Sequence, residues 1–136
     1  MAALVLTESD VLPNADTANI TRTVLAGATI TAGQPVYKDS ALKYHPARSG
    51  TAEASSVEGI SLNGAALNQP FEIIVGGVID FNAVVSVGEP YYSGTGAGSI
   101  VPDADLGTGD YVTFLGIGKT TTQLLLHIRP TGISHA

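Results

Sequence analysis

A chain of 136 residues can form one domain but is too short for two independent cores of ordinary size. Charged residues make up only 13% of it, about half of the roughly 25% usual in soluble domains, whereas apolar residues reach 44%, so a disordered chain is excluded. The net charge of −6 argues against a nucleic-acid partner, and the absence of Cys excludes disulfides, thiolate metal sites and a cysteine nucleophile.

Residues 1–25 differ in pattern from the rest of the chain. The apolar run 2–6 has no basic residue before it and is followed by acidic ones, so we expect no export signal and a protein made in the cytoplasm. No run approaches the ~18–20 apolar residues of a membrane-spanning helix, so no membrane partner is expected. Short apolar runs, interrupted by Pro13 and polar residues, indicate an extended N-terminal arm; a plain additional strand or a disordered leader is the alternative.

Residues 26–136 are predicted to form a single β domain. β-Branched residues between glycines lead from Ala26 into a strand at 34–39. Further strands are predicted at 57–62, 71–75, 78–81, 88–93, 111–116 and 123–128, with glycine-rich turns at 63–64, 76–77, 94–98 and 107–109. No window carries the apolar stripe of an amphipathic helix, so the predicted fold class is all-β.

An internal repeat divides this domain into halves at 26–77 and 83–132. The motif Gly33-Gln-Pro-Val-Tyr37 returns as Gly88-Glu-Pro-Tyr-Tyr92, Gly59-Ile60 returns as Gly116-Ile117, and the apolar strand 71–74 is matched by 125–128. Because about 50 residues cannot bury a core alone, we expect the halves to pack together as a small β-barrel or sandwich with a pseudo-twofold internal repeat. The two tyrosines should then occupy equivalent strand positions.

Two stretches resemble ligand-binding loops but lack a required residue. Gly116-Ile-Gly-Lys-Thr120 ends like a phosphate-binding loop, but Thr113 stands where that motif needs its first glycine, so a tight turn between strands is expected. The segment from Asp103 to Asp110 begins like a calcium loop, yet Phe114 takes the position of the bidentate Glu. We therefore expect no cofactor and no metal site.

The chain also lacks a recognisable catalytic constellation. None of His45, His127 and His135 has a second His or a carboxylate three or four residues away, and no Gly-x-Ser-x-Gly motif supplies a nucleophile. The sequence therefore predicts a protein without enzymatic activity.

Several segments together resemble a known family. The run 88–93, the segment Gly98-Ser-Ile-Val-Pro102 and the stretch 105–118 before an apolar terminal strand resemble the C-terminal half of head decoration (cement) proteins of tailed bacteriophages. Residues 26–39 resemble the first strand and Gly-x-Pro-x-Tyr turn of those proteins. The resemblance implies a non-enzymatic virion protein, made in the host cytoplasm and located on the capsid exterior, that binds the major capsid protein, commonly as a homotrimer, and stabilises the capsid.

The low charge and the many small residues are compatible with such an adhesive role. On this interpretation the arm supplies the capsid-binding anchors, and its available apolar side chains are Leu4, Leu6, Val11 and Leu12. Two alternatives stay open: a structural subunit of a phage tail or head-completion ring, and a receptor- or glycan-binding head-fibre module. The last would need exposed aromatic residues, and the chain has only 6% aromatic residues and no Trp.

Overall fold

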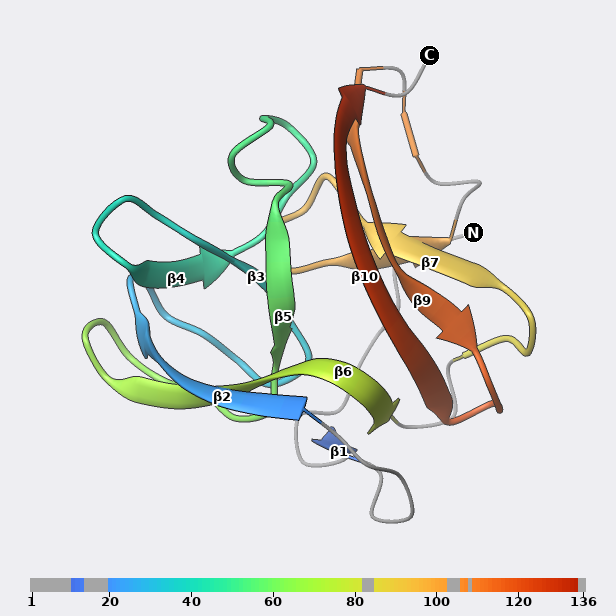
Figure 1. Cartoon of the computed structure of the whole chain (residues 1–136), viewed down its shortest axis with the longest axis horizontal. Helices are drawn as coiled ribbons and strands as arrows, with labels where there is room; N and C mark the ends of the chain where they lie inside the picture. Colours follow the sequence, from blue (N-terminus) through green and yellow to red (C-terminus); the bar gives the residue numbers. More distant parts are fainter. Residues whose placement is uncertain (1–10, 14–19, 82–84, 103–105, 108, 135–136) are drawn as a thin grey trace.

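Strands are the regular elements of the computed structural model, which describes residues 11–13, 20–81, 85–102, 106–107 and 109–134 (Figure 1). In chain order they are β1 (Leu12–Pro13), β2 (Ile20–Ala26), β3 (Pro35–Lys38), β4 (Lys43–Pro46), β5 (Val57–Ser61), β6 (Pro70–Asp80), β7 (Pro90–Ser93), β8 (Ile100–Pro102), β9 (Tyr111–Gly118) and β10 (Gln123–Ser134). The described residues contain no helix that could cross a membrane. The all-β prediction is confirmed.

The first half of the chain closes into a five-stranded barrel. Its strands follow the order β2-β4-β3-β5-β6, and β2 closes the ring by pairing with both β4 and β6. The parallel pairing with β4 is confined to Leu25 and Ala26, whereas the antiparallel pairing with β6 extends from Ile20 to Leu25. Because the ring of strands is closed, the barrel has no free edge strand. The main-chain hydrogen-bonding groups of neighbouring strands are paired with each other.

Strand β2 corrects the predicted boundary of the N-terminal arm. Residues 20–25, which the sequence pattern assigned to the arm, are part of the barrel wall because they pair with β6. The pattern was misleading because nearly all of β2 is exposed and only Ala26 is buried, so apolar and polar residues do not alternate along it. The additional strand, weighed as an alternative for this stretch, is present from Ile20 onward.

A second sheet, β10-β9-β7-β8, continues from the barrel through strand β6. The first part of β6 pairs with β2 as far as Gly76, and its second part pairs with β10 from Gly77 onward. The prediction of a turn at these two glycines is therefore wrong. They lie inside one strand at the point where it changes partner, and Gly77 adopts a φ of 107°, which a residue without a Cβ tolerates.

The strand register confirms the predicted internal repeat. Tyr37 lies opposite Val57, and Tyr92 lies opposite Phe114. In each half the register shifts by one residue immediately before the tyrosine, so both halves carry a β-bulge at the same place. The two tyrosines therefore occupy equivalent positions.

The turns that open the two repeats are also equivalent. Gly33 and Gly88 both have positive φ, 89° and 78°. The amide of Gly33 donates to the carbonyl of Ser61 and the amide of Gly88 to the carbonyl of Gly118, each at 2.8 Å. These carbonyls follow the Gly-Ile motif by one residue in both halves, so the same turn is attached to the same strand position.

The last predicted correspondence between the halves is displaced by three residues. Ile60 pairs with Ile74, and its counterpart Ile117 pairs with Leu125. Ile74 therefore corresponds to Leu125, not to Ile128 as the sequence spacing suggested. The displacement arises because the loop between β5 and β6 is longer than the turn between β9 and β10.

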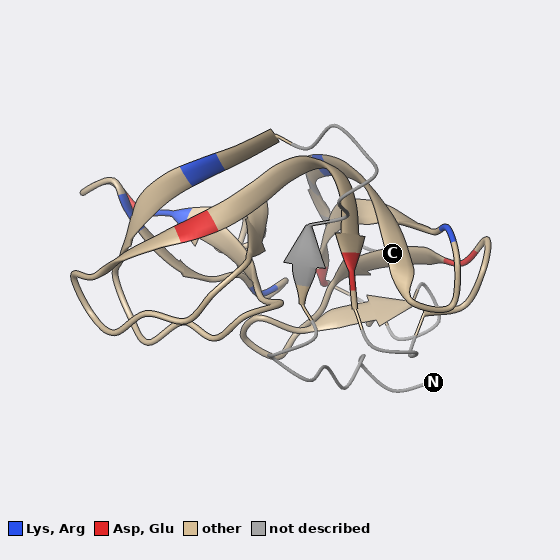
Figure 2. Cartoon of the chain, turned by 90° about the horizontal axis from the view of Figure 1, so that it is seen from below, with Lys and Arg blue, Asp and Glu red and all other residues tan. Residues whose placement is uncertain are grey.

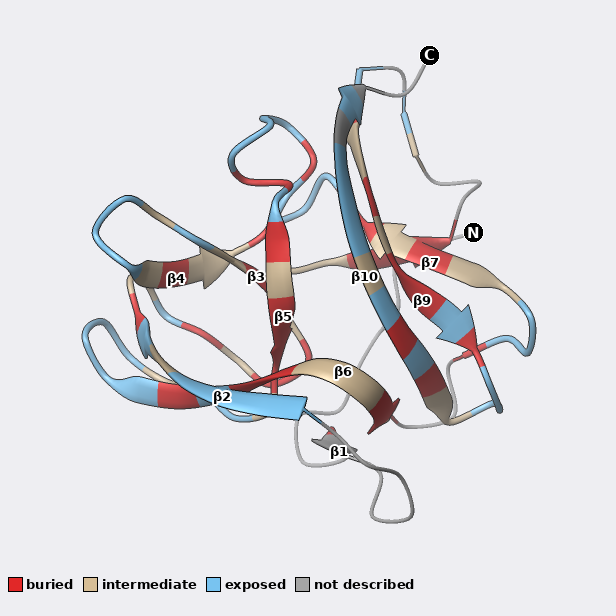
Figure 3. Cartoon of the chain, viewed as in Figure 1, coloured by how far each residue is buried: buried red, intermediate tan, exposed pale blue. Residues whose placement is uncertain are grey.

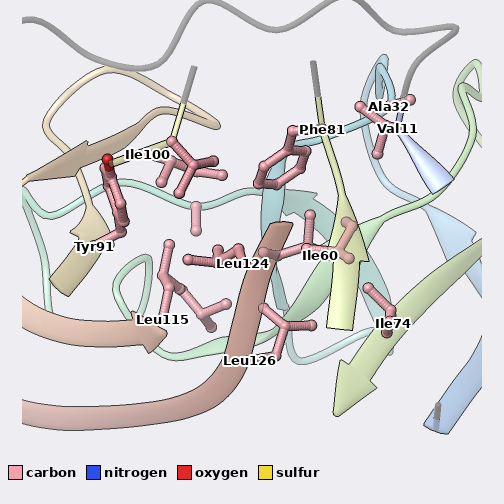
Figure 4. Packing of buried hydrophobic residues seen from close by; sticks show 14 residues of the cluster. Val11, Ala32, Ile60, Ile74, Phe81, Tyr91, Ile100, Leu115, Leu124 and Leu126 are labelled. Carbon is pink, nitrogen blue, oxygen red and sulfur yellow. The ribbon is translucent and has the colours of Figure 1, made fainter. Parts of the chain in front are cut away.

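Two apolar clusters show how the halves are stacked. The barrel interior holds Ala26, Ile30, Val36, Tyr44, Phe71 and Ile73. The larger cluster lies between the outer side of the barrel and the second sheet, and it contains Val57, Ile60 and Ile74 from the barrel and Tyr91, Ile100, Leu115, Leu124 and Leu126 from the sheet (Figure 4). The second half thus covers the outer side of the first with its own inner face.

Candidate functional site

Of the four proposed arm anchors, the structure describes the side chain of Val11 and the backbone of Leu12. Leu4 and Leu6 lie outside the described residues. Val11 is only 2% exposed and belongs to the larger apolar cluster, so it is not available to a partner in this conformation. Leu12 lies in β1, opposite Asp80 of β6. Val11 is therefore a core residue in this conformation, and capsid binding through the four residues stays a prediction.

The stretches that resemble ligand-binding loops serve as structural turns where they are described. Gly116–Gly118 ends β9, and Lys119 begins a tight turn in which its amide donates to the carbonyl of Gln123 at 2.9 Å. Thr113 is fully buried, and its hydroxyl donates to the carbonyl of Ser55 in the first half. Residues 103–105 and 108 lie outside the described part, and Asp110 accepts a hydrogen bond from the amide of Gly107 at 2.7 Å.

One histidine pairs with a carboxylate, but the pair supports a hairpin. His45 Nε2 lies 2.7 Å from Asp39 Oδ2, and the His45 ring stacks on Tyr37. Asp39 Oδ1 also accepts the amides of Ala41 and Lys43, and the hydrogen bond from Lys43, followed by that from His45, lowers the pKa of Asp39. His127 approaches Arg129 instead, and His135 lies outside the described residues.

A polar group also connects side chains of β2, β4 and β5. The hydroxyl of Tyr44 is 3.5 Å from Glu58, whose carboxylate is 3.9 Å from the guanidinium of Arg22. Burial, and then the negative charge of Glu58, raise the pKa of Tyr44. An exposed ion pair at this distance contributes little stability. Across the described residues, no group of three or more His, Asp or Glu side chains is placed to hold a metal ion.

The described surface is close to electrically neutral although the chain is acidic. All six basic residues lie within the described part. Five of the twelve acidic residues fall outside it: Glu8, Asp10, Asp16, Asp103 and Asp105. The charged residues that remain are few and scattered over the strands and loops (Figure 2). Such a surface can be covered by a partner with little cost from removing charges from water.

Three exposed leucines gather at one end of the barrel, and we call them the barrel-end leucines. Leu25, Leu42 and Leu67 are 46%, 66% and 59% exposed. Leu25 pairs with Lys43, the residue after Leu42, and with Pro70. The β5–β6 loop that carries Leu67 is attached here, because the amide of Asn68 donates to the carbonyl of Ala26 at 2.8 Å. Figure 3 shows the loops that join β3 to β4 and β5 to β6 exposed at this end.

Leu42 is unusual in its backbone as well as in its exposure. Its φ of 64° lies in the left-handed region, which costs a residue with a Cβ roughly 1–2 kcal/mol. The turn is closed around it, since Asp39 Oδ1 accepts the amides of Ala41 and Lys43. Gly or Asn would fit this turn without strain. Strained residues of this kind are concentrated at functional sites, so Leu42 stands out as a candidate contact residue.

The sequence contained only a faint signal for the barrel-end leucines. Leu42 and Leu67 are each followed by a polar residue, whereas Leu25 stands between Val24 and Ala26, and none of the three belongs to a periodic apolar pattern. An isolated Leu between the turn formers of a hairpin is the signal that could have singled out Leu42. Leu25 and Leu67 become neighbours of that turn only through the pairing of β2 with β4 and β6.

No protein-family model matches the chain, and no curated protein matches it.

Proposed function

We propose that the chain is a structural virion protein that binds the outer surface of an assembled phage capsid and stabilises it, without enzymatic activity. The resemblance of residues 26–39, 88–93, 98–102 and 105–118 to head decoration proteins suggests this role, and the nearly neutral described surface is compatible with it. The observation that carries the proposal is the set of barrel-end leucines. They combine large apolar exposure with a strained backbone at Leu42.

The barrel end is the part of the described surface best suited to the capsid. Covering an exposed leucine removes apolar area from water, which contributes about 25 cal/mol per Å² before the costs of association are subtracted. Leu25 lies in strand β2, and Leu42 and Leu67 lie in loops attached to the closed barrel, so the three side chains need little reorganisation on binding. The arm residues Leu4 and Leu6 would add contacts to the same partner, the major capsid protein. The resemblance implies a homotrimer. Self-association of this kind would let several weak contacts to the capsid act together.

The proposal is tested by co-sedimentation of the purified protein with empty shells of the virus that encodes it. Leu42→Gly is the most informative variant, because glycine favours a positive φ and the fold should not lose stability. We expect Leu42→Gly and Leu67→Asn each to weaken shell binding about tenfold, which corresponds to about 1.4 kcal/mol. The matched control is Val87→Ser, since Val87 is 67% exposed but lies in the second half before β7.

The outcomes separate this proposal from its alternatives. Binding to shells that is lost in the two leucine variants and kept in Val87→Ser supports it. No binding to shells, with formation of rings by the protein alone, would favour a tail or head-completion subunit. Binding to host cells in place of shells would favour a receptor- or glycan-binding module.

A further inference from the structure

The loop between β5 and β6 contains the one Asn-Gly pair of the chain, Asn63-Gly64. Both residues are exposed, and neither has a part in the proposed function. An asparagine side chain is chemically labile, because the main-chain nitrogen of the next residue can attack its carbonyl carbon. Glycine in the next position obstructs this attack least, since it has no Cβ. The pair is therefore a candidate for chemical modification.

The main-chain nitrogen of Gly64 is available for this attack. It donates no hydrogen bond to any of the residues that the structure describes. The loop is nevertheless anchored on both sides of the pair. Before it, the amide of Leu62 donates to the carbonyl of Glu72 at 2.8 Å. After it, the amide of Ala65 donates to the carbonyl of Ile30 at 3.0 Å. The nitrogen that has to lose its proton and attack is thus left to the solvent within an anchored loop.

The carbonyl group of the Asn63 side chain is held by a main-chain donor. Its Oδ1 accepts a hydrogen bond from the amide of Glu72 at 2.8 Å. This oxygen gains negative charge when the nitrogen of Gly64 bonds to Cγ. A main-chain N–H directed at such an oxygen stabilises the tetrahedral intermediate. The fold therefore polarises the group that is attacked and leaves the attacking nitrogen free.

Asn68, in the same loop, provides a comparison within the chain. It is exposed as well, and its Oδ1 is also polarised, by Nζ of Lys43 at 2.5 Å. The next residue, however, is Gln69, which has a side chain and whose amide donates to the carbonyl of Ala66 at 3.0 Å. The two asparagines thus differ in the attacking nitrogen. We expect the reaction at Asn63 and not at Asn68.

We propose that Asn63 is a site of spontaneous deamidation in the folded protein. The nitrogen of Gly64 gives up its proton and forms a bond to Cγ of Asn63. The bond between Cγ and Nδ2 breaks, and the leaving nitrogen takes up a proton and departs as ammonia. Water then opens the succinimide ring at either of its carbonyls, which leaves aspartate or isoaspartate at position 63. One water is consumed and one ammonia is released, with no oxidant or reductant.

Either product changes the end of the barrel that carries Leu67. Both add a negative charge beside the main chain of Glu72. Isoaspartate also adds one main-chain carbon before the bridge between Ile30 and Ala65, which attaches the loop to the barrel. Leu67 lies two residues beyond that bridge, so its position should shift. The modification itself is independent of capsid binding, whereas its effect on shell binding rests on the proposed function.

The test is incubation of the purified full chain at mildly alkaline pH under native conditions, followed by peptide mapping and by enzymatic methylation of isoaspartate. We expect isoaspartate at position 63, none at position 68, and a thermal transition that persists during the incubation. Gly64→Ala should slow the reaction at least about tenfold. Because a Cβ there would lie 3.2 Å from the carbonyl oxygen of Ile30, Asn63→Gln serves as a second variant. Its longer side chain closes the ring far more slowly.

A parallel incubation in urea shows whether the fold permits the reaction. Isoaspartate at position 63 that forms in urea and not in the folded chain would overturn the inference. Equal rates at Asn63 and Asn68, or an unchanged rate in Gly64→Ala, would overturn it as well. Incubated wild type should then bind shells more weakly than incubated Gly64→Ala. Unchanged shell binding after isoaspartate has formed would leave the modification established and count against the barrel end as the capsid-binding surface.

Discussion

Gly59 and Gly116 face the same main-chain atom at equivalent places in the two halves. A Cβ on Gly59 would lie 2.8 Å from the carbonyl oxygen of Ile74, and a Cβ on Gly116 would collide with the carbonyl oxygen of Leu125. Ile74 and Leu125 are themselves equivalent, since each pairs with the isoleucine that follows the glycine. The Gly-Ile motif is therefore repeated because each bulged strand approaches its neighbour too closely for a side chain.

This relationship predicts that alanine at either glycine destabilises the protein. We expect Gly59→Ala and Gly116→Ala to lower the free energy of unfolding by roughly 1–3 kcal/mol, with the larger effect at Gly116, because the obstructing atom belongs to the backbone and cannot turn away. Urea denaturation measures the change. Gly50→Ala is the control, since a Cβ there would meet no atom within 4 Å. Equal stability of all three variants would show that the close approach is not real.

A buried hydroxyl connects the two halves and should contribute to their packing. Thr113 on β9 donates to the carbonyl of Ser55 in the first half. Thr113→Val keeps the shape of the side chain but leaves that carbonyl without its donor, which should cost about 1–3 kcal/mol. Thr113→Ser keeps the hydroxyl and should recover part of the loss. If Thr113→Val unfolds at the same denaturant concentration as wild type, the hydrogen bond contributes nothing to stability.

The hairpin that carries Leu42 should be sensitive to acid. The amide of Lys43 and the side chain of His45 lower the pKa of Asp39 below its ordinary value of 3.8, so the folded state favours the carboxylate. Its contribution is fully present above pH 3.8 and is lost as the pH falls through the lowered pKa. Asp39→Asn keeps an acceptor oxygen but removes the charge.

The measurement for Asp39 is the melting temperature of wild type and Asp39→Asn across that acidic range. We expect the difference between the two proteins to shrink as the pH falls. A difference that stays constant down to the lowest pH would argue that the charge of Asp39 has no part in holding the turn.

We expect Val11 and the residues before it to have different roles: Val11 contributes to stability, and Leu4 and Leu6 contribute to shell binding. Val11→Ala should lower the free energy of unfolding by about 1–2 kcal/mol, because two buried methyl groups are removed at about 0.8 kcal/mol each. Deleting residues 2–9 removes Leu4 and Leu6 but keeps Val11, and on the arm proposal it should weaken shell binding while the thermal transition is retained. Unchanged shell binding after the deletion would reject Leu4 and Leu6 as anchors.

The repeat was the most predictable part of the fold, because each of its motifs has a local cause. A glycine with positive φ, a proline that opens a strand and a glycine at a bulge are all visible as residue types at fixed spacing. Strand β2 was not predictable in the same way, since its exposed threonines and Arg22 show no alternation. The continuation of β6 through Gly76-Gly77 was also hidden, because a pair of glycines indicates a turn unless the partner strands are known.

The candidate site was less predictable than the fold. Leu42 acquires its significance from a backbone angle, which is a property of the folded chain and not of the sequence pattern. Sequence spacing alone did not even align Ile74 with Leu125, because the loop before β6 is longer than the turn before β10.

The central claim is that this chain covers a capsid, with the barrel end against the shell. Cryo-electron microscopy of empty shells incubated with the purified full chain tests it most directly. The account predicts extra density on the outer surface of the shell, with Leu25, Leu42 and Leu67 facing the shell. Shells without extra density, or copies bound with the barrel end toward solvent, would contradict it.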